Sequence, residues 1–177
     1  DVAGHEFAHG VVRYTVDLVY QNQSGALNES FADIFGYAVD PDDWFMGEGL
    51  PGGALRDLSN PPDRGQPDHM SNYINTSGDY GGVHTNSGIH NKVAYLLFQG
   101  DGFQGFTIRR LGIEKTQRLF YNMLENRRMT NNAQFIDARN AAIAEAASLA
   151  GRRSYGFTSN DVCQVQNAYA AVGLGVA

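Results

Sequence analysis

The chain has 177 residues, of which 42% are hydrophobic and 18% charged, and its formal net charge at pH 7 is -6. This balance is typical of a folded protein that buries a core, either as one domain or as one lobe of a larger enzyme. The negative charge argues against nucleic acid and anionic membranes as partners, and no stretch is apolar enough to span a bilayer. A single cysteine excludes an internal disulfide framework.

The first half of the chain predicts two helices. Asp1 lies where the dipole of the first helix favours an acid. Because this helix begins with the first residue, we expect a processed product or a fragment. The second helix ends at Asp40-Pro41. The expected elements, in order, are a helix over residues 1–14, an extended piece at 18–20, a turn at 21–25 and a helix over 26–39.

The rest of the chain divides into an irregular region and a helical region. Most prolines and many glycines lie between residues 40 and 83, which predicts a long loop with a function or with bound ions. Apolar residues then recur at helical spacing. We expect helices over residues 86–99, 112–127, 132–149 and 158–172. The predicted fold is therefore mainly α, with a helix pair at 1–39, an irregular region at 40–83 and a helical bundle at 84–177.

The segment His5-Glu6-Phe7-Ala8-His9 predicts a metal site. Four residues of a helix advance by about 6 Å and about 400°, so His5 and His9 lie on one face and can hold one metal. Glu29, from the second helix, can supply a third ligand and leave one open position on a catalytic zinc. Glu6 is then placed to act as a general base. The alternative is two structural histidines and two solvated glutamates on unrelated helices.

Four motifs in the same order resemble the thermolysin-like neutral zinc metalloendopeptidases. They are Asp1-Val-Ala-Gly-His5-Glu6-Phe-Ala-His9-Gly10, Gly25-Ala-Leu-Asn28-Glu29-Ser-Phe-Ala-Asp33-Ile34, Gly53-Ala-Leu55-Arg56 and Gly81-Gly82-Val83-His84-Thr85-Asn86-Ser87-Gly88-Ile89. A lone His-Glu-x-x-His segment would be much weaker support. The resemblance implies that this chain is the helical C-terminal lobe of a two-lobe catalytic domain, with one catalytic Zn²⁺. The β-rich N-terminal lobe is absent from the chain.

Two residues of the second helix are expected to support the zinc ligands. Asp33 lies one turn after Glu29 and should accept a hydrogen bond from the free ring nitrogen of a zinc-binding histidine. Asn28 is expected to orient the site in a similar way or to contact the substrate. The alternative for Asp33 is a charge on the helix surface.

The resemblance also assigns roles around the reacting carbonyl group. It implies that His84 donates to the oxyanion, that Asp79 orients His84, and that Tyr20 is a second donor. It implies that Arg56 binds a substrate carbonyl on the leaving-group side. Tyr20 could instead be a core residue, and Arg56 could be a buried partner of an acid, which does not exclude the first role.

Three apolar residues are candidates for the wall of the pocket that takes the residue after the cut: Val2, Leu55 and Val83. An apolar wall implies a preference for Leu, Phe, Ile or Val at that position. Simple core packing is the alternative for all three. His69 and His90 receive no assigned function, and we expect His90 to be solvated or structural.

Acidic residues from several segments are candidates for a structural calcium site. They are Asp1, Asp40, Asp42, Asp43 and Glu48. Because the loop is short and Phe45 replaces an acid of the family's double site, the resemblance implies one Ca²⁺, not two. The alternative is a solvated acidic loop.

Together these features predict a zinc-dependent endopeptidase that cuts on the amino side of bulky apolar residues. The resemblance implies peptide or protein substrates, secretion as a precursor with a propeptide, an extracellular mature enzyme, and an N-terminal lobe as partner. Two alternatives remain at this point. The chain could be a zinc- and calcium-binding lobe that is inactive alone, or a helical interaction module with an accidental motif.

Overall fold

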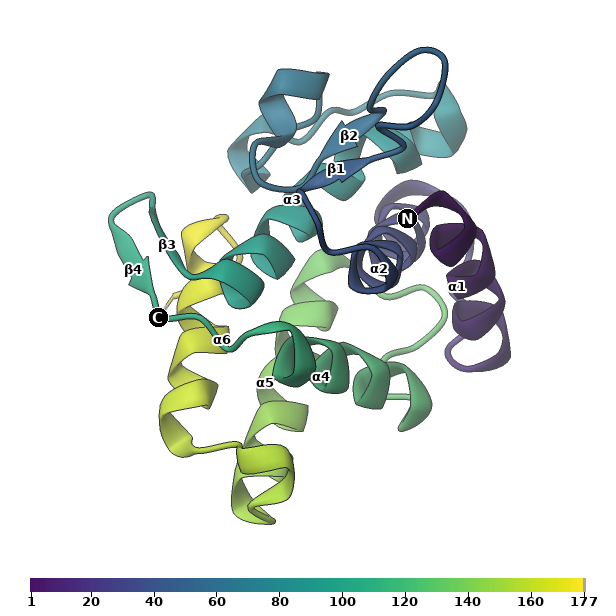
Figure 1. Ribbon diagram of the computed structural model, residues 1–177. Helices are drawn as coiled ribbons and strands as arrows, with labels where there is room; N and C mark the ends of the chain where they lie inside the picture. The colour runs from purple at the N-terminus through teal and green to yellow at the C-terminus, as the bar shows by residue number, and fades with distance from the viewer. Residues whose placement is uncertain (177) are drawn as a thin grey trace.

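The computed structural model describes residues 1–176 and shows a mainly α fold, as the sequence predicts (Figure 1). Two short antiparallel sheets accompany the helices. The helices are α1 (Val2–Tyr14), α2 (Asn22–Val39), α3 (Asp79–Gln99), α4 (Ile113–Glu125), α5 (Phe135–Gly151) and α6 (Ser159–Ala171). The strands are β1 (Phe45–Met46), paired with β2 (Arg56–Asp57), and β3 (Asp101–Phe103), paired with β4 (Phe106–Ile108).

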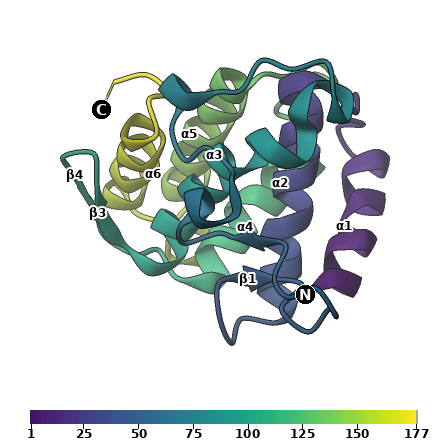
Figure 2. The same cartoon turned by 90° about the horizontal axis from the view of Figure 1, so that it is seen from above.

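Helix α2 lies between α1 and α3 and packs against both (Figure 2). Its buried side chains, such as Phe31 and Ile34, belong to a core that continues through α4, α5 and α6. Asp1 caps α1, because its side chain accepts a hydrogen bond from the backbone of Val2. Since α2 is buried on most sides, the residues that it presents toward α1 are held rigidly. No helix within residues 1–176 combines the length and apolarity needed to cross a membrane.

Helix α2 begins at Asn22, so the turn expected at residues 21–25 was wrong. The Ser24 hydroxyl donates to the carbonyl oxygens of Val19 and Gln21, at 2.7 and 2.8 Å, and ties the incoming chain to the first turn. Gly25 suggested a turn, but here the glycine provides space. A Cβ at that position would collide with the side chain of Val83. Close packing therefore overrides the weak helix propensity of glycine.

The β3–β4 hairpin was not expected from the sequence. Its two-residue loop is Gln104-Gly105, and both residues have positive φ, 48° and 82°. Two residues with positive φ are typical of the tight turns that join antiparallel strands. The strands themselves have three residues each, too few to give a clear alternating pattern.

The region between α2 and α3 contains β1, β2 and two short 3₁₀ helices, η1 (Pro61–Arg64) and η2 (Met70–Asn72). Helix α3 starts earlier than the expected residue 86, but its first turn is not regular. Tyr80, Gly81 and Gly82 all have left-handed backbone angles, and regular helix follows from Val83. This turn fixes the direction in which the chain enters the helix.

His90 is fully buried in the core. Of the two expectations for it, solvated or structural, the structural one is therefore correct. Its Nδ1 lies 2.8 Å from Ser30 Oγ, and its Nε2 lies 2.8 Å from Tyr169 Oη. The ring also makes edge contacts with Phe31 and Phe120. Burial lowers the pKa of His90 to about 3, because a charged imidazolium would be desolvated there. His90 is therefore neutral in the folded chain.

Neutral burial of His90 predicts loss of stability in acid. Its folded pKa of about 3 lies below the ordinary value of 6.5. Between these values the unfolded chain binds a proton that the folded chain does not, so stability decreases as the pH falls through this window. We expect this residue to contribute a slope of about 1.4 kcal/mol per pH unit between pH 6 and pH 4. Urea unfolding of the wild-type chain and a His90→Gln variant across this range measures the difference. Equal slopes in the two proteins would contradict the prediction.

Candidate metal centre

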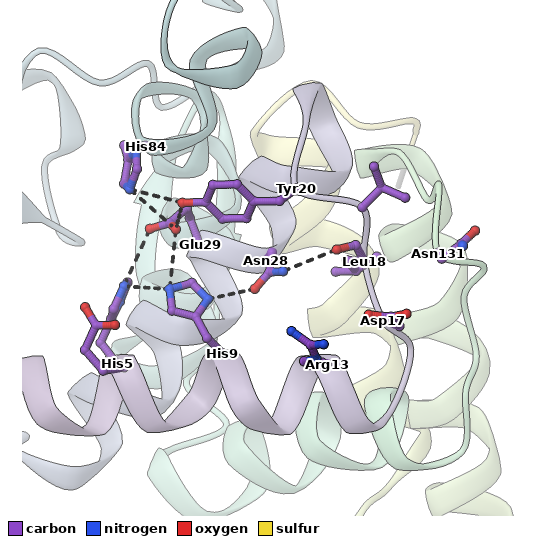
Figure 3. A pocket seen from close by; sticks show the side chains of 12 residues that line it. His5, His9, Arg13, Asp17, Leu18, Tyr20, Asn28, Glu29, His84 and Asn131 are labelled. Carbon is purple, nitrogen blue, oxygen red and sulfur yellow. Dashed lines mark hydrogen bonds and ion pairs between the residues drawn. The ribbon is translucent and has the colours of Figure 1, made fainter.

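Helices α1 and α2 bring His5, His9 and Glu29 to one point (Figure 3). His5 and His9 are one helical turn apart on α1, and Glu29 faces them from the middle of α2. The two Nε2 atoms are 3.1 Å apart. His5 Nε2 lies 3.5 Å from Glu29 Oε2, and His9 Nε2 lies 3.4 Å from Glu29 Oε1. These three residues are therefore placed as the sequence predicts for one ion.

The hydrogen bonds of the two rings show which nitrogen atoms are free. His5 Nδ1 lies 2.8 Å from Asp33 Oδ1, and His9 Nδ1 lies 2.8 Å from Asn28 Oδ1. Both partners are acceptors, since the amide nitrogen of Asn28 is turned to the carbonyl oxygen of Leu18. Each ring therefore carries its hydrogen on Nδ1 and turns the lone pair of Nε2 toward the other ring. Two lone pairs 3.1 Å apart repel each other unless a cation lies between them.

The donor set fits zinc. Zinc–ligand bonds of 2.0–2.1 Å in a tetrahedron place the ligand atoms roughly 3.3 Å apart, close to the distances among these three side chains. Glu29 is 1% exposed, and its Oε2 has no hydrogen-bond partner among the described residues. A buried carboxylate oxygen without a partner is costly, and a bound cation would satisfy it. Two imidazoles and one carboxylate leave one tetrahedral position for chemistry.

Asp33 is fully buried and connects the metal centre to Arg56 of β2. Arg56 Nε and Nη2 donate to the two carboxylate oxygens at 2.8 and 2.7 Å. Burial alone would favour the neutral acid, but the charge of Arg56 and the hydrogen bond from His5 outweigh it and lower the pKa of Asp33. The carboxylate is therefore ionised, which fixes the orientation of the His5 ring.

On the other side of Glu29 lie Tyr20 and His84. The Tyr20 hydroxyl donates to Glu29 Oε1 and lies 3.2 Å from His84 Nε2. Burial and the hydrogen bond to Glu29 raise the pKa of Tyr20, so its hydroxyl remains a donor. Asp79 accepts from His84 Nδ1 at 2.6 Å and from the His84 backbone at 2.9 Å. The structure thus brings Tyr20, His84 and Asp79 together as the sequence resemblance implies.

The backbone around His84 is held from both ends. The side chain of Gln66 donates to the His84 carbonyl oxygen at 2.6 Å. Before His84, Asp79 and Tyr80 have φ of 51° and 50°, a left-handed conformation that is unfavourable for residues with a side chain. Strain of this kind persists where the surrounding structure fixes it, and it is common at functional sites. Sequence reasoning did not identify Gln66, because only the folded chain brings it near residue 84.

A cavity of about 180 Å³ lies beside Glu6 and His84. Two of the three apolar residues expected at a pocket wall, Val2 and Leu55, line it together with Arg56, and Met46 of β1 adds another apolar side chain. Val83 does not line this cavity. It is fully buried against Gly25, because His84 faces the site and the preceding residue on the helix consequently faces the core.

A larger cavity of about 610 Å³ opens over His5, His9 and Glu29 and continues along α1. Glu6, His9 and Glu29 lie on its wall, and its far end is formed by Arg13, Asp17 and Asn131. These last three residues were not predicted, because they carry no motif and Asn131 is distant in sequence. Glu6 therefore lines both cavities, as do His5 and His84.

The acidic residues of the proposed calcium site are brought together only in part. Asp1, Asp40 and Glu48 each place one carboxylate oxygen within 4.8 Å of the others. Asp43 is not a member of this group. Its side chain instead accepts a hydrogen bond from the backbone of Phe45 at 2.8 Å and shapes the turn before β1.

The helical fold and this donor set define the chain as a lobe of a metallopeptidase. Residues 16–174 match the family described as the thermolysin metallopeptidase, alpha-helical domain. The chain belongs to this family.

Similar proteins agree with this assignment. The chain is 46% identical to bacillolysin from Brevibacillus brevis and 45% identical to thermolysin from Alicyclobacillus acidocaldarius subsp. acidocaldarius, over 98% of the chain and 33% of each relative. A solved precursor of protealysin from Serratia proteamaculans aligns with a TM-score of 0.79 and 31% identity, over 98% of this chain and 56% of that one. The chain thus spans only about a third of the length of the first two relatives.

Proposed function

We propose that the chain is the catalytic helical lobe of a zinc endopeptidase. The observation that carries this proposal is the pair of His Nε2 lone pairs, 3.1 Å apart, that face a buried carboxylate of which one oxygen has no hydrogen-bond partner within residues 1–176. His5, His9 and Glu29 would hold the ion. When bound, zinc would polarise the substrate carbonyl and make water acidic enough to attack near neutral pH.

The residues around the ion have separate tasks in this proposal. Glu6 accepts the proton of the attacking water and passes it to the leaving amine. His84 donates to the oxyanion from Nε2 when it carries hydrogens on both ring nitrogens, while Asp79 accepts from its Nδ1. Tyr20 is the second donor once its hydroxyl turns from Glu29 Oε1 toward the oxyanion. Arg56 keeps further N–H groups beyond the two bonded to Asp33, and these can bind a substrate carbonyl. Arg56 would thereby combine the two roles considered for it from the sequence, which are pairing with a buried acid and binding a substrate carbonyl.

The small cavity supports a preference for a bulky apolar residue after the cut. Its volume of about 180 Å³ suits one aliphatic side chain, and Val2, Met46 and Leu55 offer it no hydrogen bond. An extra or missing methylene in such a pocket changes binding by about 1–3 kcal/mol. We therefore expect peptides with Leu after the scissile bond to be cut fastest. Peptides with Ala there should be cut more slowly, and peptides with Asp slowest.

Protein digestion tests the proposed activity. The 177-residue chain is incubated with zinc, calcium and casein, and in parallel with a chelator in place of the metals. We expect casein fragments in the first sample and none in the second. Fragments that persist with the chelator would contradict a zinc mechanism.

A second candidate function is a metal-binding lobe that is inactive without its β-rich partner. Large apolar side chains on the outer side of α1 and α2 favour it, since Phe7 is 79% and Val39 70% exposed. They border an apolar cavity of about 630 Å³ between α1, α2 and α4. Large apolar side chains that are exposed side by side often mark a surface that contacts another protein surface. Stoichiometric zinc binding without casein cleavage would support this candidate.

Zinc should stabilise the fold, because a ligand that binds only the folded state shifts the unfolding equilibrium. At a free zinc concentration 100 times Kd, the gain is about 2.7 kcal/mol. For a domain of this size that corresponds to roughly 5–10 °C in Tm. Thermal unfolding with and without zinc measures this shift. A His9→Ala variant should lose most of it, and an equal shift in that variant would place the zinc elsewhere.

We further infer one structural Ca²⁺ near Asp1, Asp40 and Glu48, where carboxylates from three segments converge. The resemblance to a secreted family supports an extracellular mature enzyme with peptide or protein substrates. The solved protealysin neighbour is a precursor, which supports a precursor form with a propeptide here as well.

A further inference from the structure

We infer that Asn91 is a positioning residue that fixes the Asp33–His5 pair and the helix of His84 in one arrangement. This inference rests on the proposed function. Asn91 lies on α3, is fully buried, and donates from Nδ2 to Asp33 Oδ2 at 2.8 Å. It touches no ligand atom of the metal centre, so its action would pass through Asp33.

The orientation of the Asn91 amide follows from chemistry. Its oxygen cannot face Asp33, because both atoms would be acceptors. In the observed orientation, Asn91 Oδ1 is buried and has no hydrogen-bond partner among the described residues. An apolar residue would avoid that cost. The hydrogen bond that the amide donates to Asp33 therefore accounts for the presence of Asn at residue 91.

This bond completes the set of donors around Asp33. Oδ1 faces His5 Nδ1 and Arg56 Nη2, and Oδ2 faces Arg56 Nε and Asn91 Nδ2. With two donors on each oxygen, the carboxylate has no freedom to rotate. Loss of the Asn91 donor leaves Oδ2 with a single bond and lets the plane of the carboxylate turn, and with it the ring of His5.

Asn91 also links the two halves of the site. It follows His84 by seven residues, which is two turns of α3 and a rotation of about 20°, so both residues face the same side. Asp33 belongs to α2 and His5 to α1. One hydrogen bond therefore ties the helix that carries the oxyanion donor to the helices that carry the metal ligands.

Zinc affinity of an Asn91→Leu variant tests the inference without relying on turnover. Outer residues that hold a metal-binding histidine typically change metal affinity by 10–100-fold, and we expect about a tenfold weaker Kd. In an Asp33→Asn background the same replacement should change Kd by less than twofold, because the residue through which Asn91 acts is altered. Val93→Ala, in the core on another side of α3, is the control and should leave Kd unchanged.

A Kd within twofold of wild type in Asn91→Leu would overturn the inference, as would an equal loss in the Asp33→Asn background. If Asn91→Leu does not fold, Asn91→Ser, whose side chain is too short to reach Asp33, provides the same comparison. Zinc stoichiometry of the wild-type chain is measured first. Absence of zinc there would overturn the proposed function and this inference with it, whereas zinc binding that is insensitive to residue 91 overturns only the inference.

Discussion

Replacement of Asp33 by Asn should lower the free energy of unfolding of the metal-free chain by about 3–5 kcal/mol. Asn has almost the same shape, so no cavity forms. The loss arises because the buried guanidinium of Arg56 keeps its charge and loses its paired carboxylate. Asp33 has a lowered pKa in the folded chain, so its contribution is present at neutral pH and is lost as the pH falls below the ordinary range of aspartate. Urea unfolding at pH 7 with a chelator measures the change.

A double variant separates the ion pair from other effects. Asp33→Asn combined with Arg56→Met removes both charges, and pairs of buried charges can often be replaced together at little cost. The double variant should therefore be more stable than the sum of the two single losses implies.

Lys115→Met is a control for the buried position of the pair. It breaks a partly exposed pair with Asp161 and should lower the free energy of unfolding by less than about 1 kcal/mol. A loss below 1 kcal/mol in Asp33→Asn would show that the buried pair contributes little.

The helices could be predicted because their signals are local. Capping residues such as Thr158 and apolar residues at helical spacing mark α6 within its own segment. The start of α2 could not be predicted, because the close contact with Val83 that requires a glycine at position 25 joins segments distant in sequence. The β3–β4 hairpin was missed although Gln104-Gly105 offers a turn signal, since its strands are too short to show a pattern.

The convergence of His5 and His9 could be predicted from spacing alone, because they lie one helical turn apart, whereas Glu29 was added from the family resemblance. Several contacts that support these side chains could not be predicted from spacing and are visible only in the folded chain. Only the folded chain shows that Arg56 is both on the wall of the small cavity and bonded to Asp33. Gln66 and Asn91 carry no motif, and each reaches the site through a contact between distant segments. Such contacts depend on tertiary packing, which periodicity does not encode.

The strained turn before α3 illustrates how the site departs from local preference. Asp79 and Tyr80 adopt positive φ without being glycine, at a cost of order 1–3 kcal/mol each. The same geometry allows Asp79 to accept hydrogen bonds from both the ring and the backbone of His84. The backbone of Asp79 and Tyr80 thus departs from its local preference at the place where it positions His84, a proposed catalytic residue.

Glu6→Gln should lower kcat/KM for peptide hydrolysis by about 10²–10⁴-fold, which is about 2.7–5.5 kcal/mol in the barrier. Glu6 lies on α1 between the two histidines in sequence, and its exposed side chain lines both cavities beside the metal ligands. Glutamine keeps the size and polarity of the side chain but cannot accept a proton. Because Glu6 is not among the three converging donors, zinc affinity should remain within twofold of wild type. Steady-state kinetics with a fluorogenic peptide and zinc titration measure the two quantities.

Glu125→Gln is the matched control, since the same change is made at an exposed residue at the end of α4 that lines neither cavity beside the three converging donors. It should leave both quantities unchanged. If the lobe alone shows no turnover, the comparison is made in a longer form that carries the β-rich lobe. Activity above a tenth of wild type in Glu6→Gln would show that another group takes the proton, and the 610 Å³ cavity over the metal ligands would be the place to find it. Loss of zinc together with activity would instead make Glu6 part of the metal site, and the division of roles proposed for α1 would fail.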